Sequence, residues 1–193
     1  MRSDYLPPNC WRELYRVMTA DNVNAMRVSL ETGLRIDDVL SLRPQDVKKK
    51  GGSYSIEYTA KKTNKSGKAG ISADLARELL GRAGTAWLFE GRQKDKHRTR
   101  QAVYKDVKKA AKLLGAVGQI SPHSARKTFA VELRKRSGVA EVQKALQHSN
   151  ADVTHLYAFA DMASKGGAIA SQRDFAEMVA DVVIERLKAE SYK

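Results

Sequence analysis

A histidine–arginine pair and an arginine–aspartate pair have the residue types and the spacing needed to act on a phosphate group. His123 and Arg126 are three positions apart, so an imidazole and a guanidinium project from the same face of one helix. Arg35 follows a helix break at Gly33, and Asp38 lies three positions further on the same expected helix face. Guanidiniums bind phosphate oxygens in a bidentate fork, and imidazoles exchange protons near neutral pH. Taken alone, each pair also fits a solvated helix surface, so neither pair decides the function.

A further histidine and a tyrosine follow towards the C-terminus. His148 closes the motif Leu146-Gln147-His148, and Tyr157 comes after it on an expected helix. On its own, His148 is typical of a histidine near a helix C-terminus, and Tyr157 of an aromatic core residue. Only the combination with the two arginine motifs makes these residues candidates for a shared site.

In this order and at these separations, the motifs resemble the two signature boxes of the tyrosine recombinase (phage integrase) family. The motifs are Thr32-Gly33-Leu34-Arg35, His123-x-x-Arg126, Leu146-x-His148 and Tyr157. The resemblance spans about residues 26–161, and the joint spacing is far more specific than any single motif. Gln147 departs from the family's usual glycine, which eases a tight turn, so the local backbone is expected to differ without loss of a chemical group.

The resemblance implies a site-specific recombinase that cleaves and rejoins DNA by transesterification through a 3′-phosphotyrosine intermediate. The implied catalytic groups are two phosphate-binding arginines, two assisting histidines and a nucleophilic tyrosine: Arg35, Arg126, His123, His148 and Tyr157. Asp38 takes the place of an acidic residue that steadies the first arginine in the family. Arginines neutralise the charge that builds on the phosphate, so neither a cofactor nor a metal ion is expected.

The family also uses a lysine on a β-hairpin, and the expected hairpin turn here contains several lysines. In some members a Lys-Thr pair ends the first hairpin strand, and Lys62-Thr63 resembles that pair. Lys62 is therefore expected to protonate the departing 5′-oxygen, with Lys61 as the alternative. Lys61, Lys65 and Lys68 are expected to contact DNA.

The elements that position these residues follow from periodicity, which predicts an α+β, mainly α-helical fold of the integrase catalytic type with a small antiparallel β-sheet or hairpin. Apolar and polar residues alternate from Tyr54 to Tyr58, which predicts a strand, and Ala69–Ser72 is the expected return strand. Ser121 and Pro122 are typical of a helix start. Helices are expected over residues 11–20, 21–31, 36–42, 73–82, 99–114, 122–137, 139–147, 150–158 and 171–190.

The domain organisation is expected to be a tyrosine recombinase catalytic domain over residues 1–163 and a C-terminal helical segment over 164–193. This segment has an apolar stripe from Phe175 to Leu187, which either packs in cis or docks on a neighbouring protomer. Family members generally carry an N-terminal helical domain that completes a clamp around DNA. The stretch before Arg35 is too short for such a domain, so we expect a catalytic fragment or a reduced, single-domain enzyme.

The charge balance favours a polyanionic partner. The chain has 35 Lys and Arg against 22 Asp and Glu, a net charge of +13, and these cations are spread along the whole chain. Together with the resemblance, this predicts double-stranded DNA and other protomers in a tetrameric synapse as partners. Cys10 is the single cysteine, and no run of about 18 apolar residues occurs, so a cytoplasmic, nucleoid-associated protein is expected.

Two other functions remain open at this point. A type IB topoisomerase uses the same phosphotyrosine chemistry to relax supercoils, and a DNA-binding protein of integrase ancestry no longer cleaves. The intact set of arginines, histidines and tyrosine argues against the non-cleaving protein. The sequence contains neither a Walker-type phosphate loop nor an HExxH-like motif, so nucleotide hydrolysis and zinc chemistry are not supported.

Overall fold

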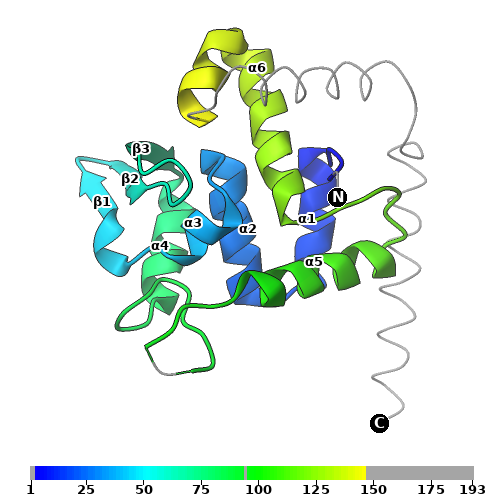
Figure 1. Cartoon of the computed structure of the whole chain (residues 1–193), viewed down its shortest axis with the longest axis horizontal. Helices are drawn as coiled ribbons and strands as arrows, with labels where there is room; N and C mark the ends of the chain where they lie inside the picture. Colours follow the sequence, from blue (N-terminus) through cyan, green and yellow to red (C-terminus); the bar gives the residue numbers. More distant parts are fainter. Residues whose placement is uncertain (1–2, 94, 147–193) are drawn as a thin grey trace.

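The computed structural model describes residues 3–93 and 95–146, which form a helical body with a small sheet at one side (Figure 1). In chain order the elements are α1 (Pro8–Tyr15), α2 (Ala20–Thr32), α3 (Ile36–Leu40), the 3-10 helix η1 (Pro44–Asp46), β1 (Val47–Lys50), β2 (Ser53–Thr59), β3 (Ser66–Ile71), α4 (Ala73–Arg82), α5 (Arg100–Leu113) and α6 (Pro122–Leu146). This arrangement confirms the expected α+β class, mainly helical with a small antiparallel sheet.

Helix α2 lies at the centre of the body. The sheet and α4 lie on one side of it and α1 and α6 on the other, while α5 crosses beneath (Figure 1). Met26 and Val28 of α2 are fully buried and belong to the same core as Trp11 and Leu14 of α1 and Leu75 of α4. Because α2 is enclosed by other elements, the turn at its C-terminal end has a fixed position in the molecule.

The sheet has the order β1-β2-β3, and both strand pairs are antiparallel. In β2 the side chain of Ile56 is fully buried, while its neighbour Glu57 is exposed and faces Lys68 across the β2–β3 pair. This alternation is the pattern that predicted the strand. The return strand starts at Ser66, earlier than the expected Ala69, because the turn after Thr59 is short.

Several helix boundaries differ from the expected ones. Helix α1 starts at Pro8, which suits a first turn, and ends at Tyr15 instead of continuing to residue 20. Pro44 follows the segment after α3 and is the first residue of the short helix η1. By contrast, the expected division into helices over 122–137 and 139–147 is confirmed, because the element α6 consists of two helical parts separated by a break at Gly138 with φ 80° and ψ −176°. This conformation is accessible essentially to glycine alone, so Gly138 fixes the change of direction.

Some expectations lie outside the described residues, namely the helices over 150–158 and 171–190 and the domain boundary after residue 163. Among the residues that the structure does describe, no helix combines the length and the apolar character needed to cross a bilayer.

Candidate active site

A tight turn between α2 and α3 presents the first arginine. Gly33 ends α2 with φ 72°, and its N–H donates to the carbonyl of Ser29 at 2.9 Å. A Cβ atom at this position would clash with the ring of Phe129, so the turn needs glycine both for its left-handed backbone and for space. Arg35 then occupies the N-cap of α3 with an extended backbone.

Buried hydroxyl groups hold this turn in place. The hydroxyl of Thr32 donates to the carbonyl of Val28 at 2.6 Å and accepts the N–H of Leu34 at 3.2 Å. The hydroxyl of Ser29 donates to the carbonyl of Leu34 at 2.8 Å. The backbone leading to Arg35 is therefore fixed, whereas the half-buried Arg35 side chain forms no hydrogen bond or ion pair with any other described residue.

The second arginine is hydrogen-bonded to the same turn. Arg126 is buried, with 4% of its surface exposed. Its Nη1 donates to the carbonyl of Gly33, and its Nη2 donates to the carbonyl of Leu146 at 2.9 Å. One guanidinium therefore joins α6, the turn before Arg35 and the last described residue of the chain.

The first turn of α6 carries the histidine. Ser121 caps this helix, since its hydroxyl accepts the backbone N–H of His123 at 3.3 Å. The side chain of His123 is exposed, three residues before Arg126 on the same helix. This confirms the helix start expected at Ser121 and Pro122.

The structure brings Arg35, His123 and Arg126 to the wall of one hollow of about 570 Å³. The hollow lies where the start of α3, the start of α5 and the start of α6 meet. Arg100 and Asp37 also line it, and their side chains form an ion pair of 3.3 Å. Arginines outnumber carboxylates in this wall, so the hollow suits an anion such as a phosphate.

Asp38 has a different contact from the one that its position suggested. Its carboxylate is buried, and Oδ1 accepts the backbone N–H of Lys61 at 2.9 Å. Among the described residues it forms no hydrogen bond or ion pair with Arg35. Asp38 thus ties α3 to the hairpin turn.

Tyr58 of β2 lies in the same electrostatic environment. Burial raises the pKa of its hydroxyl, while the positive charge of Arg126 lowers this pKa and the negative charge of Asp38 raises it. Strand β2 therefore runs close enough to both groups for their charges to act on Tyr58.

The four candidate lysines lie in the β2–β3 hairpin and do not line the hollow. The turn between these strands is closed by a hydrogen bond from the Ala60 N–H to the Lys65 carbonyl at 2.9 Å. Lys62 is exposed in this turn, next to the anchored backbone of Lys61. Lys68 forms an exposed ion pair of 3.6 Å with Glu57 on the neighbouring strand. The geometry thus places the lysine-bearing turn beside α3 without selecting one lysine.

Two expected site residues, His148 and Tyr157, lie outside the described residues. Within residues 3–93 and 95–146, no group of three or more histidine, cysteine, aspartate or glutamate side chains is arranged to hold a metal ion.

The family model described as "Phage integrase family" matches residues 7–164, most of the chain. The chain belongs to the phage integrase family. A relative from Bacillus subtilis (strain 168), named "Probable integrase/recombinase YoeC", is 30% identical over 133 residues, which cover 66% of this chain and 71% of the relative.

Solved structures of several recombinases share the fold of this integrase chain. A lambda integrase dimer bound to a COC′ core site superposes with a TM-score of 0.69 at 16% identity, over 89% of this chain and 52% of that one. XerH in a post-cleavage complex with its difH substrate gives 0.66 at 22% identity, over 80% and 49%. The catalytic domain of bacteriophage HP1 integrase gives 0.58 at 20%, over 88% and 98%. The chain thus spans about half the length of the XerH and lambda integrase chains.

Sequence reasoning missed two charged residues in the wall of this hollow, Arg100 and Asp37. Arg100 is the first residue of α5, after the N-cap Thr99. A positive charge at a helix N-terminus opposes the helix dipole and so calls for a compensating partner or an anionic ligand. The unfavourable position of Arg100 at a helix N-terminus was therefore a signal that the sequence offered. In the structure Asp37 is the ion-pair partner of Arg100.

Proposed function

We propose that this chain is the catalytic part of a site-specific tyrosine recombinase, which cleaves and rejoins DNA through a 3′-phosphotyrosine at Tyr157. The observation that carries the proposal is the hollow in which Arg35, His123 and Arg126 meet, although they come from segments far apart in the sequence. Membership of the phage integrase family supports the same activity.

In the proposed reaction the phenol oxygen of Tyr157 attacks the scissile phosphorus, and the bond from phosphorus to the 5′-oxygen breaks. Arg35 and Arg126 stabilise the charge on the non-bridging oxygens, with His123 and His148 as hydrogen-bond donors or proton carriers. The phosphotyrosine ester keeps the energy of the broken bond, so a 5′-hydroxyl reverses the step and rejoins the strand. Arg126 enters this reaction already oriented by its bonds to the backbone.

Lys62 is the proposed acid for the departing 5′-oxygen, with Lys61 as the alternative. The anchoring of the Lys61 backbone by Asp38 supports a role for this turn, because it holds the hairpin next to the helix whose N-cap is Arg35. Lys61, Lys65 and Lys68 are proposed to contact the DNA backbone, and Asp38 to position the hairpin.

The proposed partners are double-stranded DNA and further protomers assembled on it. The net charge of +13 supports a polyanionic partner. Among the structural relatives, lambda integrase has been solved as a tetramer bound to a Holliday junction. We propose residues 1–163 as the catalytic domain and residues 164–193 as a segment that packs in cis or docks on a neighbouring protomer.

The decisive experiment traps the covalent intermediate without knowledge of the recognition sequence. The full chain is incubated with a pool of nicked duplexes of randomised sequence, in which the short cleaved fragment diffuses away. A denaturant-resistant adduct is expected, and peptide mapping is expected to place it on Tyr157. Tyr157→Phe is the matched control and should bind the same duplexes without forming the adduct. An adduct that persists in Tyr157→Phe contradicts the assignment.

The adduct assay, together with a plasmid-relaxation assay, separates the two alternatives. A non-cleaving protein of integrase ancestry binds the duplexes and yields no adduct. A type IB topoisomerase yields the adduct and also relaxes a supercoiled plasmid efficiently without a recombination site, whereas a recombinase leaves that plasmid largely supercoiled.

A further inference from the structure

The start of α6, which carries His123 and Arg126, is hydrogen-bonded to a segment that lies far away in the sequence. This N-terminal segment, residues 3–6, precedes α1, and its residues are buried or half-buried. None of them lines the hollow that contains Arg35, His123 and Arg126. Any influence of the segment on that hollow therefore passes through α6 and the turn before it.

The turn before α6 is paired with Asp4 through both backbone groups of Gln119. The Gln119 N–H donates to Oδ2 of Asp4 at 2.6 Å, and the Gln119 carbonyl accepts the Asp4 N–H at 3.0 Å. Gly118 precedes this pair with φ 99°, and a Cβ atom on it would lie 2.6 Å from the same carboxylate oxygen. Because glycine permits many backbone conformations, the close contact with Asp4 selects one of them for this turn.

The hydroxyl that caps α6 is bound by the same segment. The Oγ atoms of Ser3 and Ser121 share a hydrogen bond of 2.6 Å, and Oγ of Ser121 accepts the N–H of His123 at 3.3 Å. The Ser3 carbonyl accepts from Nζ of the buried Lys127, which follows Arg126 in the helix. Ser3 therefore contacts the chain both before His123 and after Arg126.

His123 lies in the part of a helix that is least rigid by itself. It is the second residue of α6, and the first N–H groups of a helix have no partner within the helix. Such ends open locally at little cost in free energy unless other groups bind them. The bonds from Ser3 and Asp4 therefore keep this first turn in one conformation. Position matters here, because a displacement of about 1 Å in a catalytic group can slow a reaction by about 100-fold.

We propose that Ser3 and Asp4 are positioning residues for DNA cleavage, which hold the start of α6 so that the His123 imidazole meets the scissile phosphate. This inference rests on the proposed recombinase function. The two residues act through the turn at Gln119 and the cap at Ser121, since neither of them lines the hollow. Loss of Asp4 should therefore slow the covalent step without weakening the binding of the duplex.

The test compares three variants of the full chain with the parent. Asp4→Ala removes the acceptor of the Gln119 N–H, whereas Asp4→Asn keeps an oxygen at the same place. Asp46→Ala is the matched control, because the half-buried Asp46 also accepts a backbone N–H, that of Arg43 at 2.7 Å, but does not line the hollow. The rate of adduct formation is measured at saturating duplex, and the dissociation constant of the duplex is measured by fluorescence anisotropy.

Asp4→Ala is expected to form the adduct about 10-fold more slowly with an unchanged dissociation constant, because a proton-transfer group is displaced while the phosphate-binding charges remain. Asp4→Asn should recover most of the parental rate, and Asp46→Ala should match the parent. A parental rate in Asp4→Ala would overturn the proposal. So would an equal loss of rate in Asp46→Ala, or a loss of duplex affinity that accounts for the slower rate.

Hydrogen exchange distinguishes a failure of this inference from a failure of the proposed function. The amides of His123 and Ser124 both donate to Ser121, and their exchange is expected to accelerate in Asp4→Ala. The Ala76 amide, which donates to Ser72 at the start of α4, should change little. If the parent forms no adduct, accelerated exchange at His123 rejects the recombinase activity but retains Asp4 as the residue that orders the start of α6. Unchanged exchange at His123 rejects the positioning role even in an active parent.

Discussion

The two arginines that line the hollow between α3, α5 and α6 differ in what they contribute to the fold. Arg126 is buried and donates to the carbonyls of Gly33 and Leu146. Arg35 is half-buried and contacts no hydrogen-bond or ion-pair partner among residues 3–93 and 95–146. The fold therefore depends on Arg126 but not on Arg35, whereas the proposed chemistry depends on both.

Neutral substitutions at these two positions should separate stability from activity. Arg126→Gln leaves two buried carbonyls without their donor and is expected to lower the free energy of unfolding by about 2–4 kcal/mol. Arg35→Gln is expected to change it by less than about 0.5 kcal/mol. Both variants should lose the covalent adduct, as measured beside urea unfolding curves. A strongly destabilised Arg35→Gln, or a stable Arg126→Gln, would contradict this division of roles.

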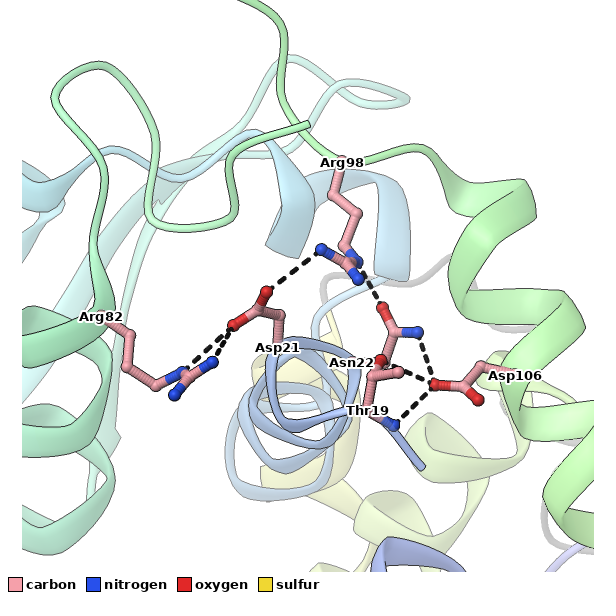
Figure 2. A network of polar contacts seen from close by, with 6 residues as sticks. All are labelled: Thr19, Asp21, Asn22, Arg82, Arg98 and Asp106. Atoms are coloured by element: carbon pink, nitrogen blue, oxygen red, sulfur yellow. Dashed lines mark hydrogen bonds and ion pairs between the residues drawn. The ribbon is translucent and has the colours of Figure 1, made fainter. Parts of the chain in front are cut away.

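At the scale of the elements, the site depends on bonds between neighbouring segments. Asp38 of α3 holds the backbone of Lys61, and the network around Asp21, Asn22 and Asp106 holds α5 against α2 (Figure 2). In this hairpin turn Ala60 is buried, whereas Lys61 and Lys62 are exposed. The bond from the Lys61 N–H to Asp38 ties the turn to α3, so this carboxylate helps to set the position of the turn relative to Arg35.

Removal of that carboxylate should loosen the hairpin without unfolding the domain. In Asp38→Ala the N–H of Lys61 loses its acceptor, which is expected to cost about 1–3 kcal/mol. The adduct should form more slowly, while duplex binding is retained. Hydrogen exchange at the Lys61 amide should accelerate, whereas the Asn64 amide, which donates to Ala60 within the turn at 2.8 Å, should change little.

Asp74→Ala is the matched control for this prediction. Asp74 is an exposed aspartate whose partner, Arg77, lies on the same helix. Its loss is expected to change stability by less than about 0.5 kcal/mol and to leave the adduct rate unaltered. Unchanged exchange at Lys61 in Asp38→Ala would show that another contact holds the hairpin.

Helical periodicity predicted most elements, because their apolar stripes face a single core. Helices α4 and α5 match their expected ranges to within one residue, and the alternation around Ile56 predicted β2. Strand β1 was not predicted, because Val47–Lys50 is short and nearly all lysine. Its strand conformation depends on its pairing with β2 rather than on its own sequence. The early start of α1 at Pro8 followed from proline chemistry that the apolar pattern alone did not reveal.

At the scale of the whole molecule, the N-terminal segment over residues 3–6 is hydrogen-bonded to the helix that bears His123 and Arg126 and to the residues just before it. The Ser3 carbonyl accepts from Lys127, the Asp4 N–H donates to the Gln119 carbonyl at 3.0 Å, and the Leu6 carbonyl accepts from the Thr128 hydroxyl at 2.6 Å. Tyr5 adds a side-chain bond to this attachment, since its hydroxyl donates to Glu132 at 3.3 Å.

The ionisation of Tyr5 should make part of the free energy of unfolding depend on pH in the alkaline range. Burial, followed by the charge of Glu132, raises its pKa from 10.0 to about 12 in the folded protein. The folded state therefore holds this proton more tightly than the unfolded state. The resulting stability is fully present below about pH 10 and is lost as the pH rises towards 12.

The Tyr5→Phe variant tests this linkage. At pH 7 it should be less stable than the parent, because the bond to Glu132 is lost. The difference in unfolding free energy should shrink between pH 10 and pH 12, since only the parent releases the tyrosine proton. A difference that stays constant over this range, measured by denaturant titration at each pH, would contradict the expected pKa.

The candidate site was predictable from sequence only in its chemistry-bearing motifs. The order and spacing of the motifs at Arg35, His123 and Arg126 predicted a shared site, and the hollow contains all three side chains. The partner of Asp38 was not predictable, because Lys61 is distant in sequence and contributes a backbone atom. The partners of Asp106 were not predictable either, since two of its hydrogen bonds come from Thr19, in the segment before α2.

The structural role of Arg126, beside the catalytic role proposed for it, has a consequence for any selection from a library of variants. A selection for soluble expression alone would retain arginine at position 126, because the carbonyls it satisfies belong to the scaffold. The same selection would accept other residues at position 35. A second library, selected for strand exchange, should retain arginine at both positions. Comparing the two sets of selected variants would therefore separate the residues required for folding from those required for the reaction.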